Sequence, residues 1–148
     1  MTDSGRDKVF SATFRTSIKA SFEKIWDTLL DEMEHPENYS SKIKKTSILE
    51  RFAGGLLRQV SVPDADVREK FNYDYEKGLV SSHLVGHPHI VGILKKTISK
   101  DPKNPETHIL ESSLEWEATE EHVDAMLRRN VASFVMDSLE KVKIKSES

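Results

Sequence analysis

The pattern of apolar and polar residues divides the chain into a strand, a helix, a run of short strands and a long final helix. Apolar and polar positions alternate over residues 9–18, which is the period of a half-buried strand. Ser21 then offers an N-cap oxygen to a helix whose apolar positions recur at helical spacing until Pro36 stops the pattern. A short second helix or a turn is expected at residues 37–41.

Residues 46–119 form short alternating runs that are separated by turn residues. The turn signals are Ala53-Gly54-Gly55, Pro63-Asp64, Glu76-Lys77-Gly78, Gly86-His87-Pro88-His89 and residues 101–105. Such spacing predicts six strands joined by hairpins. After Thr119, one apolar stripe predicts a long helix with Glu120 and Glu121 in its first turn, and residues 143–148 are expected to fray beyond it.

This order of elements predicts a single α+β domain over residues 1–148, with an ordered core at residues 8–143. One or two short helices separate the first and second strands of a seven-stranded antiparallel sheet. Because the last helix is the one element long enough to cover a face of that sheet, we expect the sheet to curve around it. Two curved surfaces need not pack flush, so a cavity for a small apolar ligand is expected between them.

Composition narrows the classes of partner. The 148 residues are 36% hydrophobic and 32% charged, and 22 basic residues nearly balance 25 acidic ones, so a folded domain is expected and nucleic acid is not the expected partner. No apolar run approaches the ~20 residues of a membrane span and residues 1–8 are polar, so we expect no integral membrane association and a cytoplasmic location. The absence of cysteine excludes disulfides and thiolate chemistry.

Hairpin geometry assigns the residues of the middle strands to two faces. If the turns are centred on Pro63-Asp64 and on a three-residue Ala53-Gly54-Gly55 loop, one face is mostly apolar and must be the interior. Its apolar members are Ile48, Phe52, Leu56, Val60, Val62, Val67, Phe71, Tyr73 and Tyr75. The opposite face carries Arg51, Gln59, Ser61, Arg68, Lys70, Asn72 and Asp74. The same reconstruction places Glu50, Arg58 and Glu69 side by side within the apolar face.

This row of an arginine between two acids permits two interpretations. Arg58 can bind a carboxylate, phenolate or enolate oxygen of a ligand while a neighbouring carboxylate moves a proton. Alternatively, the three side chains satisfy one another near the rim of the sheet and only fix the register of the strands. The sequence leaves both interpretations open, because buried charges persist when they are paired as well as when they are used.

The orientation of His83 depends on the register of its strand. One register turns Leu79, Ser81, His83 and Val85 inward, and the other turns Val80, Ser82 and Leu84 inward. We favour the first, because a loop at residues 76–78 would place His83 opposite Phe71. A turn at residues 87–88 would also place it opposite Gly92, which leaves space beside the imidazole. His83 is then a candidate general base or a histidine that is only hydrogen-bonded.

Two further sets of residues bear on a bound group. His83, His87 and His89 are close in sequence, but Pro88 places the last two in a turn and no further ligand follows at a suitable spacing, so neither a metal nor another cofactor is expected. On the final helix, polar residues interrupt the apolar stripe and adaptable apolar residues flank them. The candidate ligand contacts are Arg58, Glu69, Glu50, His83, Phe71, Tyr73, Met126, Asn130 and Phe134.

Several phrases of the sequence resemble a known superfamily. They are Trp26 in the first helix followed by Pro36 and Tyr39, Leu49-Glu50-Arg51, Gly54-Gly55-Leu56-Leu57-Arg58 and the terminal amphipathic helix. Across nearly the whole chain this resembles the helix-grip superfamily, also called START-like or SRPBCC, which includes the birch-pollen allergen. Within it, the chain looks most like the uncharacterised AtaL-like branch, which is related to polyketide cyclases. The resemblance implies a helix-grip fold and a cavity for hydrophobic molecules such as lipids or polyketides.

Three functions are compatible with this sequence, in order of preference. The first is a binding module that encloses a small hydrophobic molecule and orients it with Arg58 and its acidic neighbours. The second, which the resemblance implies for some members, is a cyclase or dehydratase acting on a polyketide-like carbonyl compound. There Glu69 or His83 would move a proton and Arg58 would stabilise an enolate. The third is a protein-interaction module. A monomer and a homodimer are both compatible with the sequence.

Overall fold

The helices and strands follow one another in the order that the sequence predicts. The computed structural model describes residues 8–63, 65–87, 90–118 and 125–148. The strands are β1 (Lys8–Ile18), β2 (Lys45–Phe52), β3 (Gly55–Val62), β4 (Ala65–Asp74), β5 (Leu79–Val85), β6 (Ile90–Lys100) and β7 (His108–Ala118). The helices are α1 (Phe22–Glu34), the short 3-10 helix η1 (Pro36–Asn38) and α2 (Ala125–Glu147).

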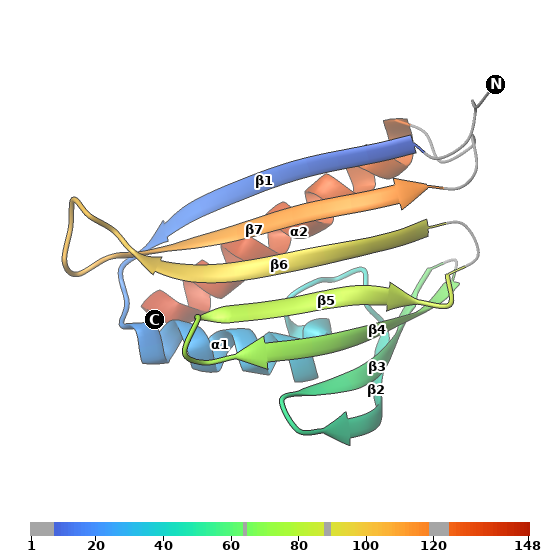
Figure 1. Cartoon of the computed structure of the whole chain (residues 1–148), viewed down its shortest axis with the longest axis horizontal. Coiled ribbons are helices and arrows are strands. Elements are labelled where there is room, and N and C mark those ends of the chain that lie inside the picture. The colour runs from blue at the N-terminus through green and yellow to red at the C-terminus, as the bar shows by residue number, and fades with distance from the viewer. Residues whose placement is uncertain (1–7, 64, 88–89, 119–124) are drawn as a thin grey trace.

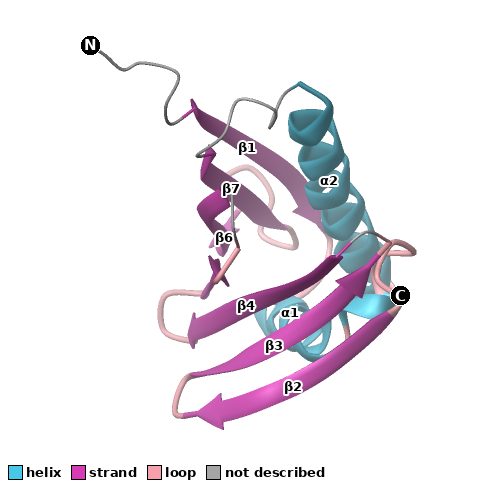
Figure 2. Cartoon of the chain, turned by 90° about the vertical axis from the view of Figure 1, so that its right-hand side faces the viewer, coloured by secondary structure: helices cyan, strands magenta, loops and turns pink. Residues whose placement is uncertain are grey.

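The strands form one curved antiparallel sheet of seven strands in the order β1-β7-β6-β5-β4-β3-β2. Both helices lie behind the sheet in Figure 1, with α2 running along β1, β7 and β6 and α1 lying beneath β5 and β4. Figure 2 shows that the sheet bends between its β1-β7-β6 half and its β4-β3-β2 half, and that the helices occupy the concave side. The predicted α+β architecture is therefore confirmed.

The hydrophobic core fills the space between the concave face and the two helices. Buried side chains of α1, of α2 and of alternate positions on the strands form this core. They include Ile25, Trp26, Leu29 and Met33 from α1, Leu56, Phe71, Val80, Ile98, Leu110 and Leu114 from the sheet, and Val131, Val135, Leu139 and Val142 from α2. Apolar burial on this scale is the main term that stabilises the fold.

Local sequence signals set both ends of α1. The side-chain oxygen of Ser21 accepts the backbone N–H of Lys24 at 3.1 Å, as expected of an N-cap. The helix ends at Glu34, because Pro36 has no N–H to continue the ladder and disfavours helical backbone at His35. Pro36 then begins η1. The sequence therefore predicted α1 correctly, and the short helix or turn expected at residues 37–41 is a 3-10 helix that lies slightly earlier, at Pro36–Asn38.

The C-terminal end of α2 continues beyond the point at which the sequence indicated fraying. The helix reaches Glu147, and Ser146 is buried, so the expectation that residues 143–148 fray is wrong. The carboxylate of Glu147 accepts the backbone N–H of Lys19 at 2.8 Å and an ammonium hydrogen of Lys143 at 2.9 Å. These two hydrogen bonds, the first more than the second, lower the pKa of Glu147 from its ordinary value. The predicted start of this helix at Thr119 to Glu121 lies outside the described residues.

The turn between β2 and β3 is shorter than the sequence analysis assumed. Phe52 lies opposite Gly55, which leaves a two-residue turn with Gly54 in the left-handed region at φ 78°. A bulge then shifts the register, so that Ile48 faces Arg58 while Glu50 faces Leu57. The loop length and the bulge together set the face to which each β2 side chain points.

Three β2 residues consequently lie on the face opposite to the predicted one. Glu50 is exposed and points away from the interior, so its predicted place beside Arg58 is wrong. Phe52 also points outward, where the Lys70 ammonium lies 5.3 Å from the centre of its ring. Arg51, which was assigned to the outer face, instead lies on the concave side and binds Glu34 of α1 at 2.9 Å.

The favoured register of β5 is also wrong. Phe71 faces Ser82, and His83 faces Lys70 on β4 and Ile93 on β6. His83 is therefore exposed on the convex face, and the alternative register, with Val80 and Ser82 buried, is the one observed. A four-residue turn after Asp74, in place of the assumed three-residue loop, slips the strand by one position and so reverses its faces.

Candidate functional site

A small cavity lies where the C-terminal end of α1, η1, the middle of the sheet and α2 meet. Its volume is about 30 Å³, and its apolar walls include Leu29, Met33, Phe71, Val80, Leu94 and Phe134. Its polar lining residues include Glu32, Arg58, Glu69, Ser82, Lys96 and Ser138. A drug-sized ligand occupies a pocket of roughly 300–1,000 Å³, so this cavity has room for no more than a few water molecules in the conformation described.

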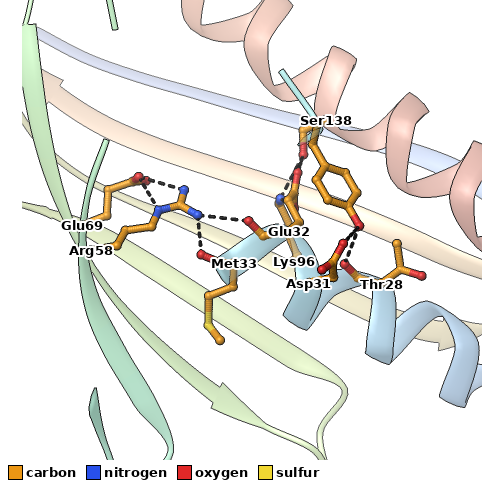
Figure 3. Close-up of polar contacts among 9 residues, drawn as sticks. Thr28, Asp31, Glu32, Met33, Arg58, Glu69, Lys96 and Ser138 are labelled. Carbon is orange, nitrogen blue, oxygen red and sulfur yellow. Dashed lines mark hydrogen bonds and ion pairs between the residues drawn. The ribbon is translucent and has the colours of Figure 1, made fainter. Parts of the chain in front are cut away.

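Arg58 lies at the centre of the first polar cluster, between the sheet and the end of α1 (Figure 3). Its Nε and Nη2 donate to Oε1 of Glu69, on the neighbouring strand, at 3.1 and 2.9 Å. Its Nη1 donates to the backbone carbonyl oxygens of Glu32 and Met33 at 3.1 and 2.7 Å. The predicted pairing of Arg58 with Glu69 on the inner face is therefore confirmed, whereas the two carbonyl contacts were not predicted.

These contacts indicate a structural role for Arg58 at the C-terminal end of α1. The last carbonyl groups of a helix have no partner within the helix, and they carry the negative end of its dipole. Arg58 is 5% exposed and satisfies two of these carbonyls on α1, while its guanidinium carbon lies 4.3 Å from the centre of the Phe71 ring. The contacts of Arg58 thus match the interpretation in which the row fixes the structure, with α1 as the element that it attaches to the sheet.

A second polar cluster joins α1, β6 and α2 on the other side of the cavity. Lys96 donates to Oε1 of Glu32, and the hydroxyl of Ser138 donates to Oε2 of the same carboxylate. The Lys96 ammonium also lies 3.0 Å from the Ser138 hydroxyl oxygen. The side chains of Lys96 and Glu32 are 12% and 10% exposed. An ammonium and a carboxylate therefore face each other in a nearly dry site, where electrostatic interactions are strong.

A buried phenol lies close to these clusters. The hydroxyl of Tyr39 donates to Oδ2 of Asp31 at 2.6 Å, and it lies 3.3 Å from the carbonyl oxygen of Thr28. Burial raises the pKa of the Tyr39 hydroxyl far above its ordinary value, and the hydrogen bond to Asp31 raises it further. Tyr39 therefore stays protonated, and it orients η1 against α1.

The other predicted ligand contacts fall in different places. Phe134 and Phe71 line the cavity. Asn130 is exposed on α2, and the side chain of Met126 lies outside the described part of the chain. Tyr73 is on the predicted inner face, yet it packs edge-on against Trp26, with ring centres 6.3 Å apart, and does not line the cavity. With Glu50 and His83 on the outside, Arg58, Glu69, Phe71 and Phe134 are the predicted residues that the structure brings together.

Glu32 and Lys96 were missed, although each carries a signal in the sequence. Glu32 falls seven residues after Ile25 and three after Leu29, so it lies on the apolar stripe of α1. Lys96 alternates with Leu94 and Ile98 on β6. In both cases a charged residue occupies an inward position. The signal in β6 is weak, because Val91 and Ile93 make the opposite face of that strand apolar as well.

Neither a metal site nor a membrane-spanning helix is found in the part of the chain that the structure describes. Within it, no group of three or more histidine, aspartate or glutamate side chains is arranged to hold a metal ion. Nδ1 of His87 accepts the backbone N–H of Ile90 at 3.2 Å, in keeping with the predicted turn, whereas His89 lies outside the described residues. None of the described helices combines the length and the apolar character that crossing a membrane requires.

Comparison with known proteins places the fold. No family model and no curated protein sequence matches this chain. Among solved structures, the Zhui aromatase/cyclase of a Streptomyces species matches with a TM-score of 0.81 and 14% sequence identity, over 95% of this chain and 94% of that one. A truncated norcoclaurine synthase from Thalictrum flavum matches with a TM-score of 0.75 and 14% identity, over 96% of both chains.

The chain therefore has the helix-grip fold, as the resemblance in the sequence indicated. The TM-scores establish the shared fold, whereas an identity of 14% to either structure leaves function to be argued from the site itself. Its assignment to the AtaL-like branch stays a prediction.

Proposed function

We propose that this protein binds a small, mostly apolar molecule between the concave face of the sheet and α2, with a polar oxygen of the ligand directed at Lys96. The observation that carries the proposal is the buried cluster of Lys96, Glu32 and Ser138 in the wall of a largely apolar cavity. Ligand sites commonly have this composition, in which a few polar groups orient a molecule that apolar side chains enclose. The two structural neighbours are named as enzymes of small-molecule chemistry, which supports the proposal.

Arg58 and Lys96 each keep one N–H donor beyond the hydrogen bonds described, but the bonds that Arg58 makes hold α1 against the sheet. The guanidinium of Arg58 has five N–H donors, and it makes four hydrogen bonds to Glu69 and to the end of α1. The ammonium of Lys96 has three N–H donors, with Glu32 and Ser138 as its two neighbours. The site residue chosen from the sequence thus maintains the fold, and a neighbouring lysine is the better ligand contact.

Room for the ligand has to come from α2. In its described part, α2 lines the cavity through Phe134 and Ser138, and Phe134 is only partly buried. Rotation of the Phe134 side chain, together with a small shift of α2 away from the sheet, would enlarge the cavity between α2 and the concave face of the sheet. A ligand that binds this open state selectively shifts the population of conformations toward it.

Shortening the side chain that closes the cavity should therefore strengthen binding. We expect Phe134→Ala to bind 2-naphthol, an apolar fluorescent molecule with one hydroxyl, about tenfold more tightly than the wild type does, because the site no longer has to open. Fluorescence titration of the folded variants measures this effect. Met136→Ala, which alters an exposed side chain of the same helix, is the matched control and should behave as the wild type. Equal affinities for all three proteins would contradict the proposal.

A cyclase or dehydratase acting on a polyketide-like carbonyl compound is the second candidate. The specific observation in its favour is that Glu32 and Lys96 place a proton acceptor and a proton donor together at the cavity. Incubation of the protein with heptane-2,4,6-trione, an open-chain triketone that can close a six-membered ring, followed by mass spectrometry, distinguishes the two functions. An enzyme converts the compound with loss of water, whereas a binding protein returns it unchanged.

A further inference from the structure

We propose that Lys96 captures aldehydes or ketones as a covalent imine, so that the ligands of this site are carbonyl compounds. The inference rests on the proposed function, because the carbonyl compound has to enter the cavity first. To the proposed function it adds the chemical class of the ligand, a carbonyl compound, and the covalent bond that this ligand forms with Lys96. One cluster contains the amine of Lys96, the carboxylate of Glu32, which can accept and return a proton of that amine, and the hydroxyl of Ser138, which can relay a proton.

The surroundings of Lys96 are those that imine formation needs. A lysine amine attacks a carbonyl only when it has lost a proton, and a neighbouring base makes that loss possible. Glu32 is in direct contact with the ammonium and can accept the proton. The small size and mostly apolar walls of the cavity, with the Lys96 side chain only 12% exposed, limit the access of the water that would hydrolyse the imine. Among the lysine side chains that the structure describes, the exposed ones lack this combination of an enclosing wall and a carboxylate in contact.

The reaction balances without any additional reagent. The Lys96 ammonium first transfers a proton to Glu32, and the neutral amine nitrogen then forms a bond to the carbonyl carbon while the C=O electron pair moves to oxygen. The Ser138 hydroxyl, which contacts both groups, passes a second proton from nitrogen to that oxygen. Glu32 returns its proton to the resulting hydroxyl, which leaves as water. An ammonium and a carbonyl thus become an iminium ion and one water molecule.

Charge is conserved at the site through this sequence. The reactant is an ammonium opposite a carboxylate, and the product is an iminium ion opposite the same carboxylate. A buried charge that loses its partner is strongly unfavourable, so a site that already pairs Glu32 with one cation also stabilises the other. The fully buried Ser112 lies opposite Lys96 on β7, and its hydroxyl lacks a hydrogen-bond partner among the described residues. It adds a polar group at the neighbouring position.

Lys95 provides a control within the same strand. It is adjacent in sequence, it is exposed, and it points to the convex face because neighbouring residues of a strand alternate. Both lysines occur in one peptide after digestion with a protease that cuts at glutamate. Labelling at Lys95 therefore reports the reactivity of an ordinary surface amine under identical conditions.

Reductive trapping of the wild-type protein tests the inference. With limiting benzaldehyde and cyanoborohydride at neutral pH, we expect the benzyl adduct at Lys96 to exceed that at Lys95 about tenfold, as peptide mass spectrometry measures. Lys96→Arg should abolish the preferred adduct, because a guanidinium keeps the charge opposite Glu32 but does not form this imine. Equal labelling of the two lysines, or labelling of Lys95 alone in the wild type, would overturn the inference, and this measurement does not depend on how any variant folds.

A parallel measurement separates this inference from the proposed function. Benzyl alcohol has nearly the shape of benzaldehyde but cannot form an imine, so its effect on the melting temperature reports binding alone. Stabilisation by benzyl alcohol without a selective adduct at Lys96 would refute the imine and leave the binding function intact. If neither compound raises the melting temperature and no selective adduct forms, the binding proposal fails together with the imine.

Discussion

Replacing Arg58 with methionine should lower the free energy of unfolding by about 3–5 kcal/mol, the range observed when one partner of a buried ion pair is removed. The change leaves the Glu69 carboxylate without its cation, and it leaves two carbonyl oxygens at the end of α1 without their donor. Urea denaturation followed by tryptophan fluorescence measures the effect, since Trp26 is a buried residue of α1 itself.

Two further variants show whether this loss has the stated cause. Arg68→Met alters an exposed arginine on β4 and should change stability by no more than about 0.5 kcal/mol. In Arg58→Met/Glu69→Met, the stranded carboxylate is removed as well, so the double variant should be more stable than Arg58→Met alone. An Arg58→Met protein as stable as the Arg68→Met control would show that Arg58 does not attach α1 to the sheet.

Replacing Lys96 with methionine should be similarly destabilising, by about 3–5 kcal/mol. The carboxylate of Glu32 would keep its hydrogen bond from Ser138 but would lose the only cation that this carboxylate contacts among the described residues. Urea denaturation again provides the measurement. Glu32 takes part in both clusters, because Arg58 binds its backbone carbonyl and Lys96 binds its carboxylate, so the loss in Arg58→Met/Lys96→Met should differ from the sum of the two single losses.

The second cluster has its own matched controls. Lys95→Met changes an exposed lysine at the adjacent position and should leave stability within about 0.5 kcal/mol of the wild type. Glu32→Met/Lys96→Met replaces the ion pair with apolar side chains and should recover most of the stability that Lys96→Met loses. A double variant that is less stable than Lys96→Met would show that Glu32 stabilises the protein through contacts other than this pair.

The fold was predictable because strong periodic signals, with helix caps and prolines, mark its elements. Ser21, Pro36 and the apolar stripes each act over a few residues, so they can be recognised without tertiary information. The register between β3 and β4 was predictable for the same reason. A tight turn after Val62 determines the pairing of Arg58 with Glu69, and the structure confirms that pairing.

The site was less predictable because it depends on which face of the sheet the alternate residues of each strand occupy. A change of one residue in the length of a turn moves every side chain of the following strand to the other face of the sheet. The turn at Gly54 is one residue shorter than assumed, and the bulge beyond it restores Ile48, but not Glu50, to the inner face. The turn before β5 is one residue longer, which moves His83 outside. Both loops are closed by glycines, and their composition fits either length.

The contacts of Arg58 illustrate a second limit. Sequence patterns within the sheet placed this residue beside Glu69, but they contained no information on where the end of α1 would lie relative to β3. That position depends on packing between α1 and β3, whose contacting residues Met33 and Arg58 are 25 positions apart in the chain. The guanidinium of Arg58, which a reconstruction of the sheet alone left available to a ligand, therefore uses most of its donors within the complete fold.

The bulge in β2 also affects how the molecule meets other copies of itself. β2 is an edge strand of the sheet. The unpaired backbone N–H and C=O groups of a straight edge strand can pair with a strand of another molecule, which promotes aggregation. The irregularity at Leu49 bends the strand and interrupts the even spacing of those groups, while Lys45 and Arg51 place positive charges toward its two ends. The feature that turned Glu50 out of the interior thus helps to keep this edge from aggregating.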